Sequence, residues 1–224
     1  MAAPAKDGRY LTPLEARRVY DRIGRFQEWQ LFYEGPAMRE LIRLAGFHSA
    51  KSILEFGCGT GALAARLIKI VPKDCRYVGI DVSPTMVRLA ASRLTNWTER
   101  ATVILSSGST TLPEPDGAFD HFVSNYVFDL LAREYASSVL AEAHRVLCVG
   151  GKLCLVSLGR DTSGLSRTVT GLREAVWKYK PEWVGGCRPS DLTALLKPNK
   201  WSIDHYSEVT SFGITSGVVV VSRC

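Results

Sequence analysis

The sequence predicts an α/β protein with a seven-stranded, mostly parallel, doubly wound sheet. Three observations predict it. Strand-like and helical segments alternate between residues 52 and 157, the last segments have the pattern of an antiparallel hairpin, and a helical region precedes the first strand. Apolar strands joined by crossover helices imply a parallel sheet that is covered by helices on both faces.

Five apolar, strand-like runs make up the alternating part of the chain: Ser52–Phe56, Tyr77–Ile80, Thr102–Leu105, His121–Ser124 and Lys152–Ser157. Three helical stretches lie between them: Ala62–Ile70, Pro84–Leu94 and Tyr135–Leu147. The chain ends in two further strand-like runs, Trp201–Thr210 and Ile214–Ser222, which are joined by a short connection at Ser211-Phe212-Gly213. Two such runs around a short glycine-containing connection predict a hairpin.

The N-terminal region, residues 1–48, predicts a helical cap. Thr12-Pro13-Leu14-Glu15 has the residues of a helix start, with Thr as N-cap, Pro at the first position and Glu at the third. The stretch that follows is amphipathic and aromatic through Phe32, Gly35-Pro36 interrupts it, and a second helix is expected over about Ala37–Ala45. Residues 49–224 then form the main domain.

A long segment at about residues 159–198 interrupts the alternation of strands and helices. It contains a predicted helix at about Leu165–Tyr179 and a loop with two adjacent glycines, Gly185-Gly186. Long loops beyond the carboxyl ends of strands usually carry a lid or a substrate site. We therefore expect a substrate-side insert here.

The composition is typical of a globular protein with a substantial core: 224 residues, 46% hydrophobic and 22% charged. No apolar run approaches the roughly 18 to 20 residues that span a bilayer, and the N-terminus lacks the apolar region of a signal peptide, so we expect a cytoplasmic protein. The six cysteines and four histidines lack metal-ligand spacing, so we expect reduced thiols and no metal site. The oligomeric state stays open.

The formal net charge of +6 raises the question of a nucleic-acid partner. The lysines and arginines are dispersed along the chain and form no dense basic run. This distribution favours a basic, solvated surface over a nucleic-acid site, although an acidic substrate or an anionic membrane surface stays possible.

The segment Ile53–Gly61, ILEFGCGTG, is an apolar strand that turns through three glycines into a helix. Glycine allows a sharp turn and a close approach by a ligand, and the helix start presents unpaired amides. Gly57, Gly59 and Ala62 also satisfy the dinucleotide-binding pattern. Glu55 argues against that interpretation, because a carboxylate beside the glycines would repel a pyrophosphate and attract an ammonium group.

The segments ILEFGCGTG and YVGIDVSPTMVRLA resemble class I S-adenosylmethionine-dependent methyltransferases of the ubiquinone/menaquinone-biosynthesis type, a broad group of small-molecule methyltransferases. The resemblance covers about residues 50–160. It implies a Rossmann-like fold, S-adenosylmethionine as cofactor with S-adenosylhomocysteine as product, and a small-molecule methyl acceptor. The C-terminal hairpin agrees with the methyltransferase version of this architecture.

The resemblance also implies cofactor-binding residues. The first group lies in and after the glycine loop: Glu55, Gly57, Cys58, Gly59 and Gly61. Asp81 ends the second strand, where a carboxylate would accept the ribose hydroxyls, and Ser83 suits the role of helix N-cap better than Asp81 does. Val82 and Met86 would flank the adenine ring, and a core role for Met86 is compatible with this.

Two further strand ends complete the expected cofactor site. Ser107-Gly108-Ser109 stands where relatives often have Gly-Asp-Ala, so the usual carboxylate is missing and adenine would be held by backbone groups or a serine hydroxyl. Ser124 and Asn125 end the fourth strand, where open α/β sheets bind ligands, and would contact the methionine part of the cofactor. Asp120 is expected to brace its strand.

The sequence patterns say less about the catalytic residue and about the residues that bind the methyl acceptor. Asp129 stands where relatives often place a histidine that faces the substrate; it would orient or deprotonate a nucleophile, or it is a plain helix-start carboxylate. An aromatic-lined acceptor pocket is expected between the cap and the insert, formed by Tyr20, Trp29, Tyr33, Trp183, Cys187 and Arg188. Two alternatives stay open: an RNA methyltransferase, or a protein that binds S-adenosylmethionine without catalysis.

Overall fold

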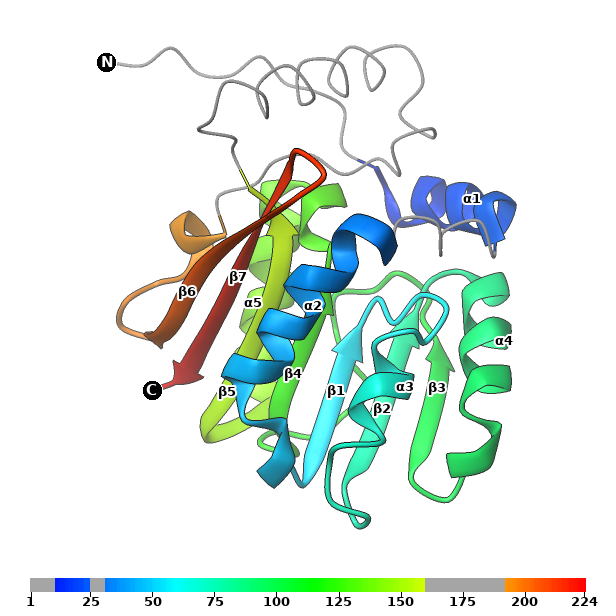
Figure 1. The fold of residues 1–224 in the computed structure, drawn as a ribbon, viewed down its shortest axis with the longest axis horizontal. Helices are drawn as coiled ribbons and strands as arrows, with labels where there is room; N and C mark the ends of the chain where they lie inside the picture. Colours follow the sequence, from blue (N-terminus) through cyan, green and yellow to red (C-terminus); the bar gives the residue numbers. More distant parts are fainter. Residues whose placement is uncertain (1–10, 25–30, 160–191) are drawn as a thin grey trace.

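The computed structural model describes residues 11–24, 31–159 and 192–224, and its centre is a seven-stranded sheet (Figure 1). The strand order is β3-β2-β1-β4-β5-β7-β6. The strands are β1 (Ser52–Phe56), β2 (Arg76–Asp81), β3 (Ala101–Leu105), β4 (Phe119–Asn125), β5 (Leu147–Leu158), β6 (Trp201–Ser211) and β7 (Ile214–Arg223).

The first five strands are parallel, and β7 is antiparallel to its neighbours β5 and β6. β6 and β7 form the predicted C-terminal hairpin, which lies at one edge of the sheet (Figure 1). The predicted fold class is therefore confirmed. From β1 the chain adds strands on one side of the sheet as far as β3, and it then returns to place β4 on the other side of β1. The carboxyl ends of β1 and β4 therefore form the topological switch point at which open α/β sheets bind ligands.

Four of the α-helices are α1 (Pro13–Ile23), α2 (Leu31–Ala45), α4 (Pro84–Arg93) and α5 (Arg133–Val146), and the short α3 is Ala64–Leu67. Short 3₁₀ helices lie at Phe47–Ser49, Thr95–Trp97, Phe128–Leu130 and Thr193–Leu195. In Figure 1, α2 and α3 lie in front of the sheet and α5 lies behind it. No helix among the described residues is long and apolar enough to cross a membrane.

The core consists of two apolar clusters, one on each face of the sheet. Because successive side chains of a strand point to opposite faces, Ile53 belongs to the cluster with α2 and α3, and Leu54 belongs to the cluster with α5. Tyr77 and Val78 of β2 divide in the same way. Strands buried on both faces explain why the sequence shows continuous apolar runs here instead of alternation.

The start of α1 is as predicted. The Thr12 hydroxyl accepts a hydrogen bond from the Glu15 amide at 3.3 Å, and the Glu15 carboxylate accepts one from the Thr12 amide at 2.9 Å. These reciprocal bonds satisfy two amides that have no partner within the helix. The helix ends at Ile23, earlier than the amphipathic pattern indicates.

The predicted break at Gly35-Pro36 is wrong, because α2 runs through it from Leu31 to Ala45. A proline removes one backbone hydrogen bond and strains the preceding turn. Burial outweighs that local cost: Tyr33, Ala37, Leu41 and Ala45 form one apolar face and are all buried in the core.

Asp120 braces the beginnings of β1 and β4, as expected. Its carboxylate accepts hydrogen bonds from the Lys51 amide at 2.6 Å and the Ser52 amide at 3.3 Å, and lies 2.7 Å from the His121 ring. Partial burial opposes ionisation, but these bonds outweigh it and hold the pKa of Asp120 below its usual value. The brace aligns the two strands whose opposite ends border the candidate site.

Candidate active site

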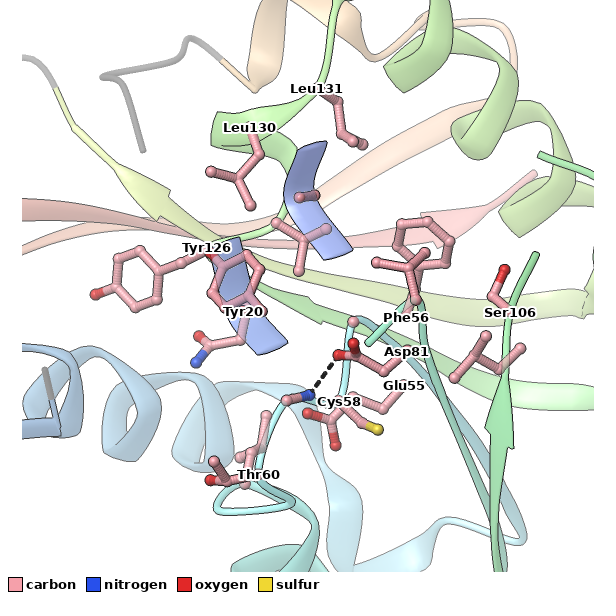
Figure 2. A pocket seen from close by; sticks show the side chains of 18 of the residues that line it. Tyr20, Glu55, Phe56, Cys58, Thr60, Asp81, Ser106, Tyr126, Leu130 and Leu131 are labelled. Carbon is pink, nitrogen blue, oxygen red and sulfur yellow. Dashed lines mark hydrogen bonds between the residues drawn. The ribbon is translucent and has the colours of Figure 1, made fainter. Parts of the chain in front are cut away.

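A cavity lies at the carboxyl ends of β1, β2 and β4, and Figure 2 shows side chains that line it. The glycine loop, the last residues of β2 and the end of β4 form its floor, and α1 contributes to its wall. Tyr20, Glu55, Cys58 and Asp81 face this space together, although they come from α1, β1, the glycine loop and β2 (Figure 2).

The glycine loop passes so close to its neighbours that a side chain would overlap at Gly57 and would be tightly crowded at Gly61. Gly57 has φ of +74°, and a Cβ there would lie 2.3 Å from Cγ2 of Val127. Gly61 has φ of +73°, and a Cβ would lie 3.1 Å from Ala90 of α4. Gly57 also donates its amide to the Ile80 carbonyl at 2.8 Å. Gly57 and Gly59 line the cavity, and Gly61 instead lets the loop pack on α4.

Glu55 is buried beneath the cavity and accepts a hydrogen bond from the Tyr77 hydroxyl at 2.7 Å. Burial raises the pKa of Glu55 to about 8, the Tyr77 bond opposes this rise, and the nearby Asp81 adds to it. A carboxyl group in this state would ionise most readily beside a cation. The sequence pattern placed Tyr77 only in the second strand and did not indicate its hydrogen bond to Glu55.

Asp81 is also buried, and both of its oxygens accept backbone hydrogen bonds. Oδ2 accepts from the Gly59 amide and Oδ1 from the Ser83 amide, each at 2.9 Å (Figure 2 shows the first). Burial raises the pKa of Asp81 despite these bonds. A carboxylate has about four acceptor sites, so each oxygen retains capacity for a ligand hydroxyl.

Ser83 is the N-cap of α4, as the sequence indicates. Its hydroxyl accepts a hydrogen bond from the Met86 amide at 3.2 Å. Val82 lines the cavity, but the fully buried Met86 does not. The position of Met86 agrees with the core role, while its contact with adenine stays a prediction.

Asn125 lines the cavity, and its side-chain oxygen Oδ1 is buried without a hydrogen-bond partner among the described residues. Leaving such an acceptor unpaired costs about 1 to 3 kcal/mol. Ser124 does not line the cavity; its hydroxyl donates to the Phe56 carbonyl at 2.9 Å and joins β4 to β1. The next residue, Tyr126, has φ of +55°, which is uncommon for a residue with a side chain.

The adenine side of the site differs in detail from the expected residues. Ser106 lines the cavity, whereas Ser107, Gly108 and Ser109 do not. Gly108 has φ of +86°, and a Cβ there would lie 2.5 Å from Pro13 of α1. The loop after β3 is therefore covered by α1, and adenine binding by residues 107–109 stays a prediction.

The residues expected on the acceptor side lie in different places. Tyr20 lines the cavity from α1, and Tyr33 is buried with its ring 6.1 Å from the ring of Tyr126, which lines the cavity. Asp129 is buried, does not line the cavity, and accepts a hydrogen bond from the Leu158 amide at 2.8 Å. This contact favours the structural interpretation of Asp129, and its catalytic role stays a prediction. The remaining candidates lie outside the described residues: Trp29, Trp183, Cys187 and Arg188.

Sequence reasoning missed most of the contribution of α1 and of the segment after β4. Pro13 and Ala16 line the cavity together with Tyr20, at the i, i+3, i+7 spacing of one helix face, and that spacing was a usable signal. Leu130 and Leu131 also line the cavity. Among the described residues, no group of His, Cys, Asp and Glu is arranged to hold a metal ion.

Comparison with known proteins shows what the central part of the chain is similar to. Residues 53–151, from β1 into β5, match the family described as a methyltransferase domain. The matched segment is somewhat less than half of the chain, and over that segment the chain is similar to methyltransferase domains. The matched segment includes the glycine loop, Asp81 and Asn125, which line the cavity at the carboxyl ends of β1, β2 and β4.

Two curated relatives are similar to this chain over more than half of its length. One is the uncharacterized methyltransferase YrrT of Bacillus subtilis (strain 168), 33% identical over 139 residues, which covers 62% of this chain and 54% of the relative. The other is the ubiquinone/menaquinone biosynthesis C-methyltransferase UbiE of Hydrogenovibrio crunogenus (strain DSM 25203 / XCL-2), 31% identical over 128 residues, which covers 57% and 50%. The chain spans about half the length of these two relatives.

A solved structure gives the same result for the fold. The N-methyltransferase NodS of Bradyrhizobium japonicum WM9, in complex with S-adenosyl-L-homocysteine, superposes with a TM-score of 0.69 and covers 93% of this chain and 98% of its own. At 18% identity, this similarity establishes the fold of the chain and no more.

Proposed function

We propose that this chain transfers a methyl group from S-adenosylmethionine to a small-molecule acceptor that binds against an apolar and aromatic wall of the cavity. The observation that carries the proposal is a set of hydrogen-bond acceptors on the floor of the cavity. Glu55, Asp81 and the unpaired Oδ1 of Asn125 border the cavity beside the glycine loop. Such a set suits a ligand that carries hydroxyl donors and a positive charge.

The residues fit this cofactor group by group. Asp81 would accept the ribose hydroxyls, because its oxygens are oriented by the Gly59 and Ser83 amides. The buried Oδ1 of Asn125 needs a donor, and the cofactor's ammonium group would supply one. Glu55 would then ionise, because a nearby cation stabilises its charged form. Val82 and Ser106 also line the cavity and would border the adenine.

When bound, the cofactor supplies a methyl group that its sulfonium already activates for displacement. The chain therefore needs chiefly to orient the acceptor in line with this group and to exclude water. Tyr20, Tyr126, Leu130 and Leu131 border the cavity and would do both. A general base would be needed only for an acceptor that must lose a proton.

Two measurements test the proposal. Calorimetry with S-adenosylmethionine and S-adenosylhomocysteine measures cofactor binding, and methyl transfer to a panel of O, N, S and activated-carbon acceptors measures activity. We expect both cofactor forms to bind and at least one apolar acceptor class to be methylated. Failure of both forms to bind at high micromolar concentration would refute the proposal.

The same measurements separate the two alternatives. Tight cofactor binding without transfer to any acceptor, RNA included, would indicate a binding protein that lacks catalysis. Methylation of RNA, with an affinity that falls steeply as salt rises, would indicate an RNA methyltransferase.

A further inference from the structure

Helix α1 lies above the carboxyl-terminal ends of the parallel strands, yet none of its residues is fully buried (Figure 1). One face of it, with Pro13, Ala16 and Tyr20, borders the cavity. A helix that covers a ligand cavity without entering the core opens at low cost in free energy, because few apolar contacts are lost.

A specific polar contact holds α1 at its C-terminal end. The Oδ1 atom of Asp21 accepts a hydrogen bond from the Ser83 hydroxyl at 2.6 Å and another from the Thr85 amide at 3.2 Å. Ser83 and Thr85 form the beginning of α4, so a carboxylate of α1 contributes to the cap of a different helix. A carboxylate at a helix N-terminus is favourable for that helix as well.

The same serine also contacts the proposed ribose-binding carboxylate. The Ser83 amide donates to Asp81 at 2.9 Å while its hydroxyl donates to Asp21. Ser83 thus joins α1, α4 and Asp81 in one hydrogen-bonded chain. Tyr20 lines the cavity (Figure 2) and directly precedes Asp21 in the helix. The contact of Asp21 with α4 therefore also sets the position of Tyr20.

We propose that α1 is a lid over the cofactor cavity, and that Asp21 is the positioning residue that holds this lid closed against the beginning of α4. The inference rests on the proposed function, since it takes the cavity ligand to be S-adenosylmethionine. The cofactor and its product exchange only when the Asp21 contacts with Ser83 and Thr85 break. While these contacts hold, the closed lid keeps water away from the sulfonium of the cofactor.

The test compares three variants with the unmodified protein. Asp21→Ala removes both contacts, and Asp21→Asn keeps an oxygen in the position that accepts from Ser83. The matched control is Asp204→Ala, because Asp204 also accepts a serine hydroxyl bond at 2.6 Å, from Ser222, but lies on β6 and does not line the cavity. None of the three substitutions replaces a residue of α4 or of the glycine loop.

Two readouts are needed. The first is the dissociation rate of S-adenosylhomocysteine, measured by displacement in stopped flow, and the second is hydrogen exchange of the α1 amides in the ligand-free protein. We expect Asp21→Ala to raise the dissociation rate by about tenfold, the order of magnitude for losing a hydrogen bond to a charged group, and to speed exchange in α1. Asp21→Asn should stay within about threefold of the unmodified protein, and Asp204→Ala should change neither readout.

Each contrary outcome has its own meaning. Unchanged exchange in α1 of Asp21→Ala would show that Asp21 does not hold the helix. Faster exchange with an unchanged dissociation rate would show that α1 opens without controlling the ligand, and either result overturns the inference. If the unmodified protein bound no S-adenosylhomocysteine, the proposed function would fail and the lid assignment with it, whatever the exchange data.

Discussion

At the scale of single residues, Asp81 has two tasks that the structure joins. Its carboxylate orders the glycine loop and the turn before α4 through the Gly59 and Ser83 amides, and it also faces the cavity. The carboxylate oxygens of Asp81 are therefore already oriented before a ligand binds, which lowers the entropic cost of binding.

We expect Asp81→Ala to weaken S-adenosylhomocysteine binding by about 1 to 3 kcal/mol, because hydrogen bonds to a charged group are lost. Calorimetry measures the affinity. Asp116→Ala is the control, since Asp116 pairs with Arg145 at 2.7 Å and does not line the cavity. Equal affinities of the Asp81 variant and the unmodified protein would contradict the ribose assignment.

Glu55 should give the ligand-free protein a distinctive dependence of stability on pH. Its pKa is raised from 4.5 to about 8 in the folded state, so the folded state holds the proton more tightly than the unfolded state. The stabilisation is fully present below about pH 4.5, falls as pH rises to about 8, and is then constant.

Glu55→Gln tests this dependence, because glutamine keeps an oxygen for the Tyr77 hydroxyl and cannot ionise. Urea unfolding between about pH 5 and pH 9 gives the free energy of unfolding of both proteins. We expect the variant to gain stability relative to the unmodified protein as pH rises toward 8. If the difference in free energy of unfolding between the two proteins did not change over this pH range, Glu55 would have an ordinary pKa in the folded protein.

At the scale of elements, the glycine loop is determined by two separate constraints. Gly57 needs a positive φ, and it also needs empty space beside Val127. Gly150 shares the first constraint, with φ of +75°, but a Cβ added there would meet nothing within 4 Å. The two glycines thus allow backbone strain and steric overlap to be separated.

We expect Gly150→Ala to cost about 1 kcal/mol from the unfavourable φ alone. Gly57→Ala should cost a further 1 to 3 kcal/mol, roughly, because the new methyl group overlaps Val127. Chemical denaturation gives both values. Equal losses would mean that the segment around Val127 moves aside freely and that the loop does not depend on its packing.

Element boundaries followed from the sequence where local signals and burial agree. β1 has the predicted bounds, Ser52–Phe56, because an apolar run between polar and glycine residues has only one placement. The break at Gly35-Pro36 was wrong because the local signal of a proline competes with the burial of a whole helix face, and only the packed sheet reveals that burial.

At the scale of the whole molecule, cofactor binding should stabilise the entire fold. The cavity is bordered by α1, β1, β2 and β4, so a ligand there connects segments that are distant in sequence. A ligand at about 100 times its dissociation constant adds about 2.7 kcal/mol to the free energy of unfolding.

For a chain of this size we expect a rise in Tm of about 5 to 10 °C with saturating S-adenosylhomocysteine. Thermal unfolding followed by circular dichroism measures it, and NADH serves as the comparison ligand. A rise with NADH alone would revive the dinucleotide interpretation that the glycines by themselves allow.

Local sequence was enough to predict the sheet, the hairpin and the glycine loop, and to propose a class of cofactor, because these depend on periodicity and on residues that are close together in the chain. It was not enough to establish which side chains face the cavity. Met86, Ser124 and Asp129 are turned into packing or backbone contacts, while Pro13, Ala16 and Leu131 border the cavity. The direction of each of these side chains depends on how α1 and the segment after β4 pack over the strand ends, and that packing joins residues far apart in sequence.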